Sequence, residues 1–317
     1  MKLQCSIPKI LLPVDGSEDA KRAVEFTGCL GGLLGKGLSV ITLLRVIAGG
    51  YLSQHLANID FRAEEIVKSS EIFKRVKEEH IEQNIMPLLN DMEKTLRELG
   101  VQAKIKKMTG EGDPANEIIR IAKEGRYTTI VMARRGVSGG KGSHLGSVTN
   151  KVIYAAAEQT VYIVGQKVLK DKACPIQRIL VPVDGSSYSM KGLEHAVCLA
   201  SGLKGFGGVT LLRVINMALF MERLKDGLDP KEESKKILNE SKNIFVQGGI
   251  PESLITTKIR TGSPAEEIIK ETLEEDYSLI IMGRKGRTAL REFILGGVSS
   301  LVLQRCQNPT VSIVSSE

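Results

Sequence analysis

A chain of 317 residues, of which 42% are hydrophobic, is long enough to bury two ordinary hydrophobic cores. Its formal net charge is +7, but lysine and arginine alternate with glutamate along most of the chain. It has no tryptophan and only 4% aromatic residues, which argues against a base-stacking surface for nucleic acid. No apolar run is long enough for a signal peptide or a membrane-spanning helix, so we expect a cytoplasmic protein with neither nucleic acid nor membrane as a partner.

Short β-branched runs alternate with amphipathic stretches along the chain. Most of the runs lack polar–apolar alternation, which indicates strands of a parallel sheet that helices cover on both faces. In chain order, strands are predicted near 8–14, 38–46, 102–108, 128–133 and 160–164, and then near 177–183, 208–214, 254–260, 278–283 and 310–314.

Four sequence motifs recur in the same order, which indicates a tandem duplication. Each copy has the length of a normal domain, and two copies are too few for a solenoid. We therefore predict domains at 1–169 and 170–317, joined near 167–175, where charges and a proline interrupt the pattern. The recurring pairs are Lys9–Ser17 with Arg178–Ser186, Leu43–Val46 with Leu211–Val214, Ile130–Gly136 with Ile280–Gly286, and Thr160–Val164 with Thr310–Val314.

The copies differ mainly after the second strand, where the first copy carries extra residues, roughly 48–80. The stretch 61–99 has apolar residues at helical spacing and is broken by Pro87. The extra segment leaves the strand at the end where a ligand is expected. It is either a cover for the first site, with Gly49 and Gly50 as a hinge, or a passive helical extension.

Two helices have clear start signals. Asp113 precedes Pro114, and Ser263 precedes Pro264, so each pair predicts an N-cap followed by proline at the first helical position. Glu266 predicts a capping box with Ser263.

An aspartate follows the first strand of each copy. In an open parallel sheet, ligands bind at the carboxyl ends of strands where the strand order reverses, and Asp15 and Asp184 belong to that end. A carboxylate there can accept hydrogen bonds from ribose hydroxyls or an adenine amine. The alternative is that Val-Asp-Gly-Ser is only a strand-to-helix turn, since these residue types favour turns.

A glycine-containing loop follows the fourth strand of each copy. Glycines allow the backbone to approach an anion, and the start of the next helix adds N–H donors and the positive end of the helix dipole. Both ends of the loop can therefore hold the same phosphates. The loop cations, which either face phosphate or are solvated, are Arg134, Arg135, Arg284 and Lys285.

This combination resembles the universal stress protein family, over nearly the whole chain and twice. The resemblance rests on Val-Asp-Gly-Ser, on the Leu-Leu-x-Val strand and on the Gly-x2-Gly-x9-Gly-(Ser/Thr) loop. It implies an α/β fold that is Rossmann-like, of the adenine nucleotide alpha hydrolase type. Two tandem open five-stranded parallel sheets, flanked by helices, would pair through their last strands as an internal pseudo-dimer. Members with this loop bind ATP or AMP, whereas others lack the loop and bind no nucleotide.

Carried over by position, the resemblance implies two nucleotide sites. The adenosine contacts fall on Pro13, Asp15 and Val46 in the first copy and on Pro182, Asp184 and Val214 in the second. The phosphate and ribose contacts fall on Met132, Gly136, Gly146, Ser147 and Val148, and on Met282, Gly283, Gly286, Gly296, Gly297 and Val298. Two positions depart from the family pattern: Ala133 replaces the first loop glycine of copy one, and Gly297 replaces the hydroxyl residue of copy two.

The predicted function is adenine-nucleotide binding by a stress-response sensor or regulator, with ATP or AMP as ligand and Mg²⁺ or Mn²⁺ on the phosphates as an option. No general base is positioned beside the loop, so we assign no catalytic residue and expect at most slow ATP hydrolysis. The alternatives are a nucleotide-free scaffold or interaction module of the same fold, and an ATP-dependent enzyme with a second substrate pocket. The protein partner and further homodimerisation stay open.

The cysteines and histidines predict no further chemistry. The five cysteines form no CxxC pair and are odd in number, which favours reduced thiols. The four histidines share no metal-ligand spacing, so we expect no metal site built from protein ligands alone.

Overall fold

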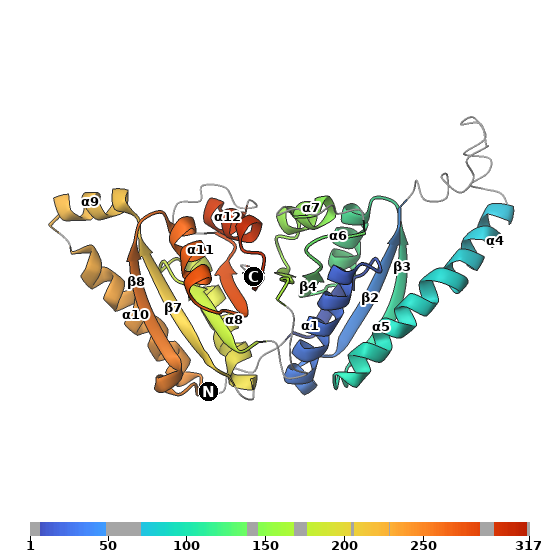
Figure 1. Ribbon diagram of the computed structural model, residues 1–317, viewed down its shortest axis with the longest axis horizontal. Helices are drawn as coiled ribbons and strands as arrows, with labels where there is room; N and C mark the ends of the chain where they lie inside the picture. The colour runs from blue at the N-terminus through green and yellow to red at the C-terminus, as the bar shows by residue number, and fades with distance from the viewer. Residues whose placement is uncertain are drawn as a thin grey trace.

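The computed structural model shows two similar halves joined through one continuous sheet (Figure 1). We call residues 7–167 half one and residues 176–315 half two. The residues that the structure describes are 7–48, 71–137, 145–167, 176–203, 206–227, 229–285 and 295–315.

Half one alternates strands and helices. Its strands are β1 (Lys9–Pro13), β2 (Val40–Ile47), β3 (Lys104–Glu111), β4 (Thr129–Met132) and β5 (Thr160–Ile163). Its helices are α1 (Glu18–Leu34), α4 (Glu71–His80), α5 (Met86–Glu98), α6 (Pro114–Glu124) and α7 (Ser147–Ala155), with a short 3₁₀ turn at Gly35–Gly37.

Half two repeats this order. Its strands are β6 (Arg178–Pro182), β7 (Gly208–Ile215), β8 (Ile255–Thr261), β9 (Leu279–Gly283) and β10 (Thr310–Val314). Its helices are α8 (Ser187–Gly202), α9 (Met217–Lys225), α10 (Pro230–Gln247), α11 (Pro264–Glu274) and α12 (Gly297–Arg305), with a 3₁₀ turn at Glu252–Leu254.

The strands form one ten-stranded sheet in the order β3-β2-β1-β4-β5-β10-β9-β6-β7-β8. All pairs within a half are parallel, and β5 pairs with β10 in antiparallel register, with Tyr162 opposite Ser312. The predicted pairing of the two copies through their last strands is therefore confirmed. The boundary predicted between 169 and 170 lies outside the described residues and stays a prediction.

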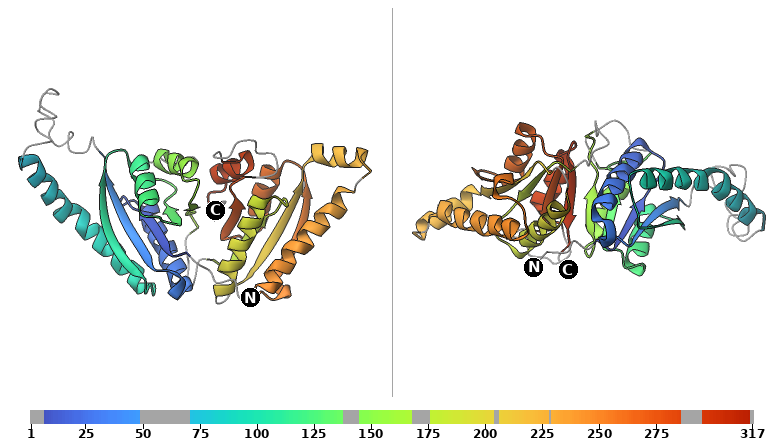
Figure 2. Two further views of the ribbon diagram at one scale, coloured as in Figure 1. Left: turned by 180° about the vertical axis from the view of Figure 1, so that it is seen from behind. Right: turned by 90° about the horizontal axis from the view of Figure 1, so that it is seen from below.

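Helices cover both faces of the sheet, and the apolar residues divide accordingly into two cores. One core lies under α1, α5, α8 and α10, and the other lies under α6, α7, α11 and α12 (Figure 2). Adjacent residues in β1 point to opposite cores: Leu11 belongs to the second and Leu12 to the first, and both are fully buried. Both cores extend across the β5–β10 join, so the halves share their interior.

On the first of these faces, the join carries a hydrogen bond between the halves. The Tyr162 hydroxyl of β5 lies 2.5 Å from Nε2 of His195 on α8, and Phe26 of α1 packs on the same tyrosine ring. Burial lowers the pKa of His195 to about 4, so this imidazole is neutral at pH 7. Burial also raises the pKa of Tyr162 above its ordinary value.

We expect the protein to lose stability on acidification through His195. The unfolded imidazole takes up a proton near pH 6.5, whereas the folded one does so only near pH 4. The stability that the neutral His195 side chain contributes is therefore fully present above pH 6.5 and is lost as the pH drops toward 4. The free energy of unfolding should fall by about 1–2 kcal/mol between pH 7 and 5. Urea unfolding of wild type and His195→Gln at both pH values measures it. The variant should lose less stability than wild type over this interval, and equal losses would contradict the assignment.

Most predicted elements are confirmed, but one predicted cap is wrong. The Asp113 side chain accepts the Asn116 N–H at 3.0 Å, as expected for an N-cap. Ser263 occupies the N-cap position of α11 but makes no side-chain cap hydrogen bond. Glu266 does not close a capping box, because its carboxylate pairs with Arg305 of α12 instead.

Pro87 does not break the helical stretch that contains it. A π-helical turn, Ile81–Ile85, joins α4 to α5, and Pro87 lies in the first turn of α5. A proline cannot donate the usual backbone hydrogen bond, and the wider π turn accommodates it while the chain keeps its direction (Figure 1). Of the extra segment at 48–80, residues 49–70 lie outside the described residues, so the cover hypothesis stays a prediction.

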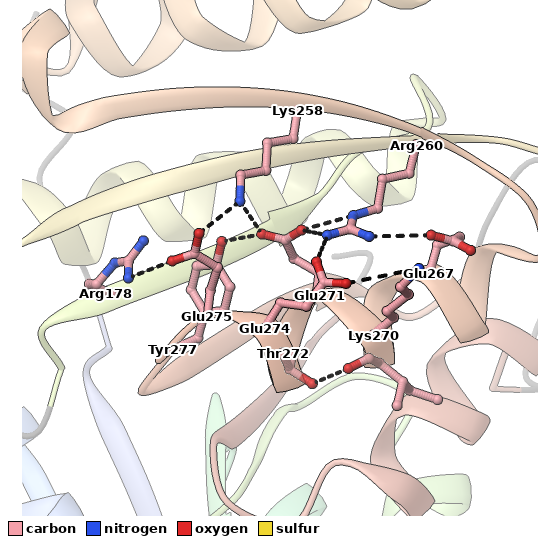
Figure 3. A network of polar contacts seen from close by, with 11 residues as sticks. Arg178, Lys258, Arg260, Glu267, Lys270, Glu271, Thr272, Glu274, Glu275 and Tyr277 are labelled. Atoms are coloured by element: carbon pink, nitrogen blue, oxygen red, sulfur yellow. Dashed lines mark hydrogen bonds and ion pairs between the residues drawn. The ribbon is translucent and has the colours of Figure 1, made fainter.

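Half two has a buried charged network between β8 and α11 (Figure 3). The Glu271 side chain is fully buried and accepts hydrogen bonds from Lys258 at 2.7 Å, from Arg260 at 2.8 Å and from the Tyr277 hydroxyl at 2.7 Å. Burial alone would raise the pKa of Glu271, but these three donors outweigh it and the net pKa is lowered. The carboxylate is therefore ionised at neutral pH and holds strand and helix together.

The structure bears on two expectations drawn from the composition, one about membrane-spanning helices and one about the cysteines. None of the described helices is long and apolar enough to cross a membrane. Cys306 carries a free thiol, whereas Cys198 on α8 is disulfide-bonded. The expectation of reduced thiols is therefore wrong for Cys198, since an odd cysteine count still leaves pairs available.

Candidate functional site at the strand ends

The strand order places one candidate site in each half. Strand order reverses between β1 and β4 in half one and between β6 and β9 in half two. Side chains at the carboxyl ends of these neighbouring strands face the crevice in which open α/β sheets bind ligands. Asp15 and Asp184 follow β1 and β6 at this end.

In half one, the structure brings Asp15 and the loop glycine together. Asp15 Oδ1 accepts the Ser17 N–H at 3.0 Å, and Oδ2 accepts the Val137 N–H at 2.8 Å. A Cβ at Gly136 would clash with Oδ2 of Asp15, so any larger residue there would force the carboxylate to move. Gly16 has φ +85°, which lets the chain turn from β1 into α1.

Half two has the same turn. Asp184 Oδ1 accepts the Ser186 N–H at 2.9 Å, and Gly185 has φ +78°. Ser186 caps α8 by accepting the Ser189 N–H, as Ser17 caps α1 by accepting the Ala20 N–H. The predicted contact Gly286 lies outside the described residues.

The two helix starts lie beside the strand ends, as the loop hypothesis requires. Gly146 and Gly296 are the N-caps of α7 and α12, and neither helix has a side-chain cap. The first-turn N–H groups of a helix have no intrahelical acceptor, so these starts offer donors to an anion. The predicted contacts in these turns are Ser147 and Val148 in half one and Gly297 and Val298 in half two.

Short hydrogen bonds fix these starts to the preceding strands. The Thr149 hydroxyl donates to the Ala133 carbonyl at 2.9 Å, and the Ser299 hydroxyl donates to the Gly283 carbonyl at 3.1 Å. Each donor–acceptor pair bridges the two ends of the loop. These two hydrogen bonds thus hold the ends of each loop close together.

The predicted adenosine-side residues line the same region from the strands. Val46 and Val214, the last residues but one of β2 and β7, are buried, as are Met132 and Met282 of β4 and β9. Pro13 and Pro182, the last residues of β1 and β6, are partly buried. Backbone groups of these residues, rather than polar side chains, would meet a base.

Gly283 has a packing role that the sequence did not indicate. A Cβ at Gly283 would lie 2.2 Å from the Tyr188 carbonyl oxygen, so α8 approaches β9 more closely than an alanine would allow. Gly192 faces it, since its own Cβ would lie 3.0 Å from Gly283 N. By the repeat, half one has Ala23 and Ala133 at these positions. The alanine at 133 is therefore matched by a second alanine at 23, where half two has two glycines in close contact.

The loop cations do not have the predicted environments. Arg134 and Arg284 are buried, 1% and 2% exposed, and their guanidinium groups hydrogen-bond backbone carbonyls of the opposite half. Burial lowers the pKa of Arg134 to about 10, so it keeps its charge at pH 7, and burial lowers the pKa of Arg284 as well. Neither faces phosphate or solvent, and the prediction for these two arginines is wrong.

The other two loop cations each contact a residue of their own half. Arg135 pairs with Asp19 of α1, with 3.7 Å between Arg135 Nε and Asp19 Oδ2. Lys285 is buried, and its ammonium lies 5.6 Å from the centre of the Tyr188 ring. Both copies have an arginine at the equivalent position, 134 and 284. This repetition was the one feature of the sequence that could have indicated that the two arginines have the same role.

The groups that converge at the strand ends fit an anionic ligand better than a metal ion held by protein ligands alone. Among the described residues, no group of three histidine, cysteine, aspartate or glutamate side chains comes together for a metal ion. What converges instead is one carboxylate, a glycine packed against it and a helix start without a side-chain cap. That donor set suits a nucleoside with phosphates, on which a hydrated divalent ion would be held by the phosphates themselves.

Comparison with known proteins gives the same family for both halves. Residues 6–164 and 175–313 each match the model of the universal stress protein family. Universal stress protein MJ0531 of Methanocaldococcus jannaschii is 26% identical over 159 residues, which are 48% of this chain and 90% of that protein. Universal stress protein YxiE of Bacillus subtilis is 29% identical over 151 residues, 43% of this chain and 97% of that protein.

A solved structure extends the likeness to the tandem arrangement. The crystal structure of a universal stress protein from Archaeoglobus fulgidus aligns with 98% of this chain and 98% of its own, with a TM-score of 0.64 and 24% sequence identity. At this identity the comparison shows the fold alone.

Proposed function

Because the chain belongs to the universal stress protein family, we propose that each half binds an adenine nucleotide, ATP or AMP, and that the protein acts as a stress-response sensor or regulator. One observation carries the proposal. The Asp15 carboxylate, Gly136 and the start of α7 converge where the strand order reverses. Asp15 and its counterpart Asp184 would accept ribose hydroxyls, and the helix starts would donate to phosphate.

The residues proposed to hold the nucleotide follow the two strand ends. Pro13 and Val46, or Pro182 and Val214, would offer backbone groups to the base. Met132, Gly136, Gly146, Ser147 and Val148 would surround ribose and phosphates in half one, with Met282, Gly283, Gly286, Gly296, Gly297 and Val298 in half two. Mg²⁺ or Mn²⁺, if present, would neutralise phosphate charge.

A nucleotide-free scaffold is the second candidate, and one observation favours it for half one. Both oxygens of the Asp15 carboxylate already accept backbone N–H groups, those of Ser17 and Val137. A ribose hydroxyl would have to share this carboxylate with both N–H groups, using the lone pairs that they leave unoccupied. Denaturing the purified protein by heat and identifying released nucleotide by mass spectrometry tests the proposal. Released ATP or AMP supports it, and protein that neither releases nor takes up nucleotide supports the scaffold.

Removing the aspartates is expected to weaken binding site by site. Asp184→Ala should lower affinity for ATP at the second site by about 1–3 kcal/mol, roughly 5- to 150-fold, the range for a hydrogen bond to a charged group. Asp15→Ala should do the same at the first site. Calorimetry gives affinity and stoichiometry for each variant.

Asp276→Ala is the matched control, because this carboxylate pairs with Lys167 and precedes β9 at the opposite end of the sheet. It should leave both affinities unchanged. If neither Asp15→Ala nor Asp184→Ala changes affinity or stoichiometry, the assigned sites are wrong.

A further inference from the structure

The Arg134 side chain leaves half one and ends on a helix of half two. Its Nη2 donates to the carbonyl oxygens of Leu303 at 2.5 Å and Gln304 at 3.0 Å, in the last turn of α12. The last carbonyls of a helix have no intrahelical donor and carry the negative end of the helix dipole. They therefore offer a buried guanidinium acceptors that carry partial negative charge.

Arg284 makes the reciprocal contact. Its Nη1 donates to the Ala156 carbonyl at 2.9 Å, and its Nη2 donates to Ile153 at 2.7 Å and Tyr154 at 2.9 Å, at the end of α7. Each of the two arginines thus extends its side chain across the β5–β10 join to a helix of the opposite half. Each closes the C-terminal end of a helix that belongs to the other half.

The backbone of the same residues holds the start of a helix in their own half. The Arg134 carbonyl accepts the Gly146 N–H at 3.0 Å, and the Arg284 carbonyl accepts the Gly296 N–H at 2.9 Å. Gly146 and Gly296 are the N-caps of α7 and α12. Each arginine is therefore attached at its backbone to one of these helices and at its side chain to the other.

These contacts form a closed ring. From Arg134 the ring runs to the end of α12, along this nine-residue helix to its start, and from there to the backbone of Arg284. It continues through the Arg284 side chain to the end of α7 and along that helix, also nine residues, to its start and back to Arg134. The starts of both helices are the proposed phosphate ends of the two sites.

We propose that this ring couples the two nucleotide sites, with Arg134 and Arg284 as positioning residues that each act on the site of the opposite half. The inference rests on the proposed function. A short helix in a close-packed core moves as a unit, so a ligand that draws the start of α12 toward its phosphates also moves the carbonyls that hold Arg134. Through the Arg134 backbone, this changes the position of the first loop.

The test uses the full chain with ATP as the probe and one site disabled at a time. In an Asp15→Ala background, calorimetry reports the second site, and Arg134→Met should raise its Kd at least fivefold, the lower end of typical coupling between sites. In an Asp184→Ala background, Arg284→Met should do the same at the first site. Arg135→Met is the matched control for Arg134, because Arg135 pairs with Asp19 of its own half, and it should change the second site less than twofold.

Two further variants separate coupling from a loosened join. Tyr162→Phe removes the bond to His195 on the opposite face of the sheet, and it should lower stability without changing either Kd. Arg134→Lys keeps the charge but cannot match the guanidinium's fixed geometry. It should act in the same direction as Arg134→Met, and it replaces that variant if Arg134→Met does not fold.

The outcomes distinguish this inference from the proposed function. If Arg134→Met leaves ATP binding at the second site unchanged, the ring is overturned, but the proposal of nucleotide binding stands. If wild type binds no ATP at all, the proposed function fails. Hydrogen exchange in the absence of ligand then tests whether the ring connects the two helices. The Gly296 and Ser300 amides, which donate to the Arg284 and Gly296 carbonyls, should then exchange faster in Arg134→Met than in Arg135→Met, and equal rates overturn it.

Discussion

Expressed separately, residues 1–169 and 170–317 are each expected to form homodimers or to aggregate, and neither should give a stable monomer. Separation would expose β5 and β10 along their full hydrogen-bonding edges, and both strands are entirely buried in the intact chain. It would also open both shared cores and leave the guanidinium groups of Arg134 and Arg284 without their carbonyl acceptors.

Light scattering coupled to size-exclusion chromatography measures the mass of each half and of the intact chain. Mixing the two halves during refolding serves as the control, and it should restore a heterodimer with the mass of the whole protein. Two well-behaved monomers at micromolar concentration would show that the join contributes little to folding.

Glu271→Ala is expected to lower the free energy of unfolding by about 2–4 kcal/mol. Removing one partner of a buried ion pair typically costs about 3–5 kcal/mol, and the lower figure applies because Lys258 and Arg260 keep partial contact with solvent. Urea unfolding at pH 7 measures the change. Glu274→Ala is the matched control: this carboxylate also pairs with Arg260 but is about half exposed, so its loss should cost less than about 1 kcal/mol.

The repeat supplies a second comparison for the same network. At the positions of Lys258, Arg260 and Glu271, half one has Met108, Gly110 and Ile121. Exchanging all three for their first-half counterparts leaves no unpaired buried charge, and the triple variant should lose less stability than Glu271→Ala alone. A larger loss in the triple variant would mean that the network adds net stability beyond satisfying its own charges.

Acid should weaken this network as well. The folded pKa of Glu271 is lowered from its ordinary value of 4.5, so its contribution is present above that pH and disappears as the pH falls through the folded pKa. This interval lies below the one in which His195 acts, so the two groups can be distinguished in a pH series.

The sequence predicted the strands well because most of them are buried on both faces and read as continuous apolar runs. The exception is β3, which runs from Lys104 to Glu111 rather than over 102–108. It is an edge strand with mostly exposed lysines, and its extent is set by pairing with β2 up to Ile47 and not by its own apolar pattern. The duplication, the order of elements and the joining of the last strands were all predictable.

The sequence could not predict the contacts that cross the join. Arginine is almost never fully buried without a partner, so a loop arginine reads as solvated or as a phosphate ligand. The acceptors of Arg134 are backbone carbonyls about 170 positions along the chain, and a carbonyl has no residue-type signature. The contact between Tyr162 and His195 was equally unpredictable, because the repeat has Ser312 and Phe26 at the equivalent positions.

The ten-stranded sheet leaves two edges, β3 at one end and β8 at the other, and this bears on how the molecules behave when crowded. Different edges at opposite ends form a head-to-tail contact that does not close, so repeated pairing would grow an open filament. β3 carries Lys104, Lys106 and Lys107, and β8 carries Lys258 and Arg260. Lys258 and Arg260 are paired with glutamates of α11, so the exposed lysines Lys104 and Lys106 on β3 are what disfavours edge-to-edge pairing between molecules.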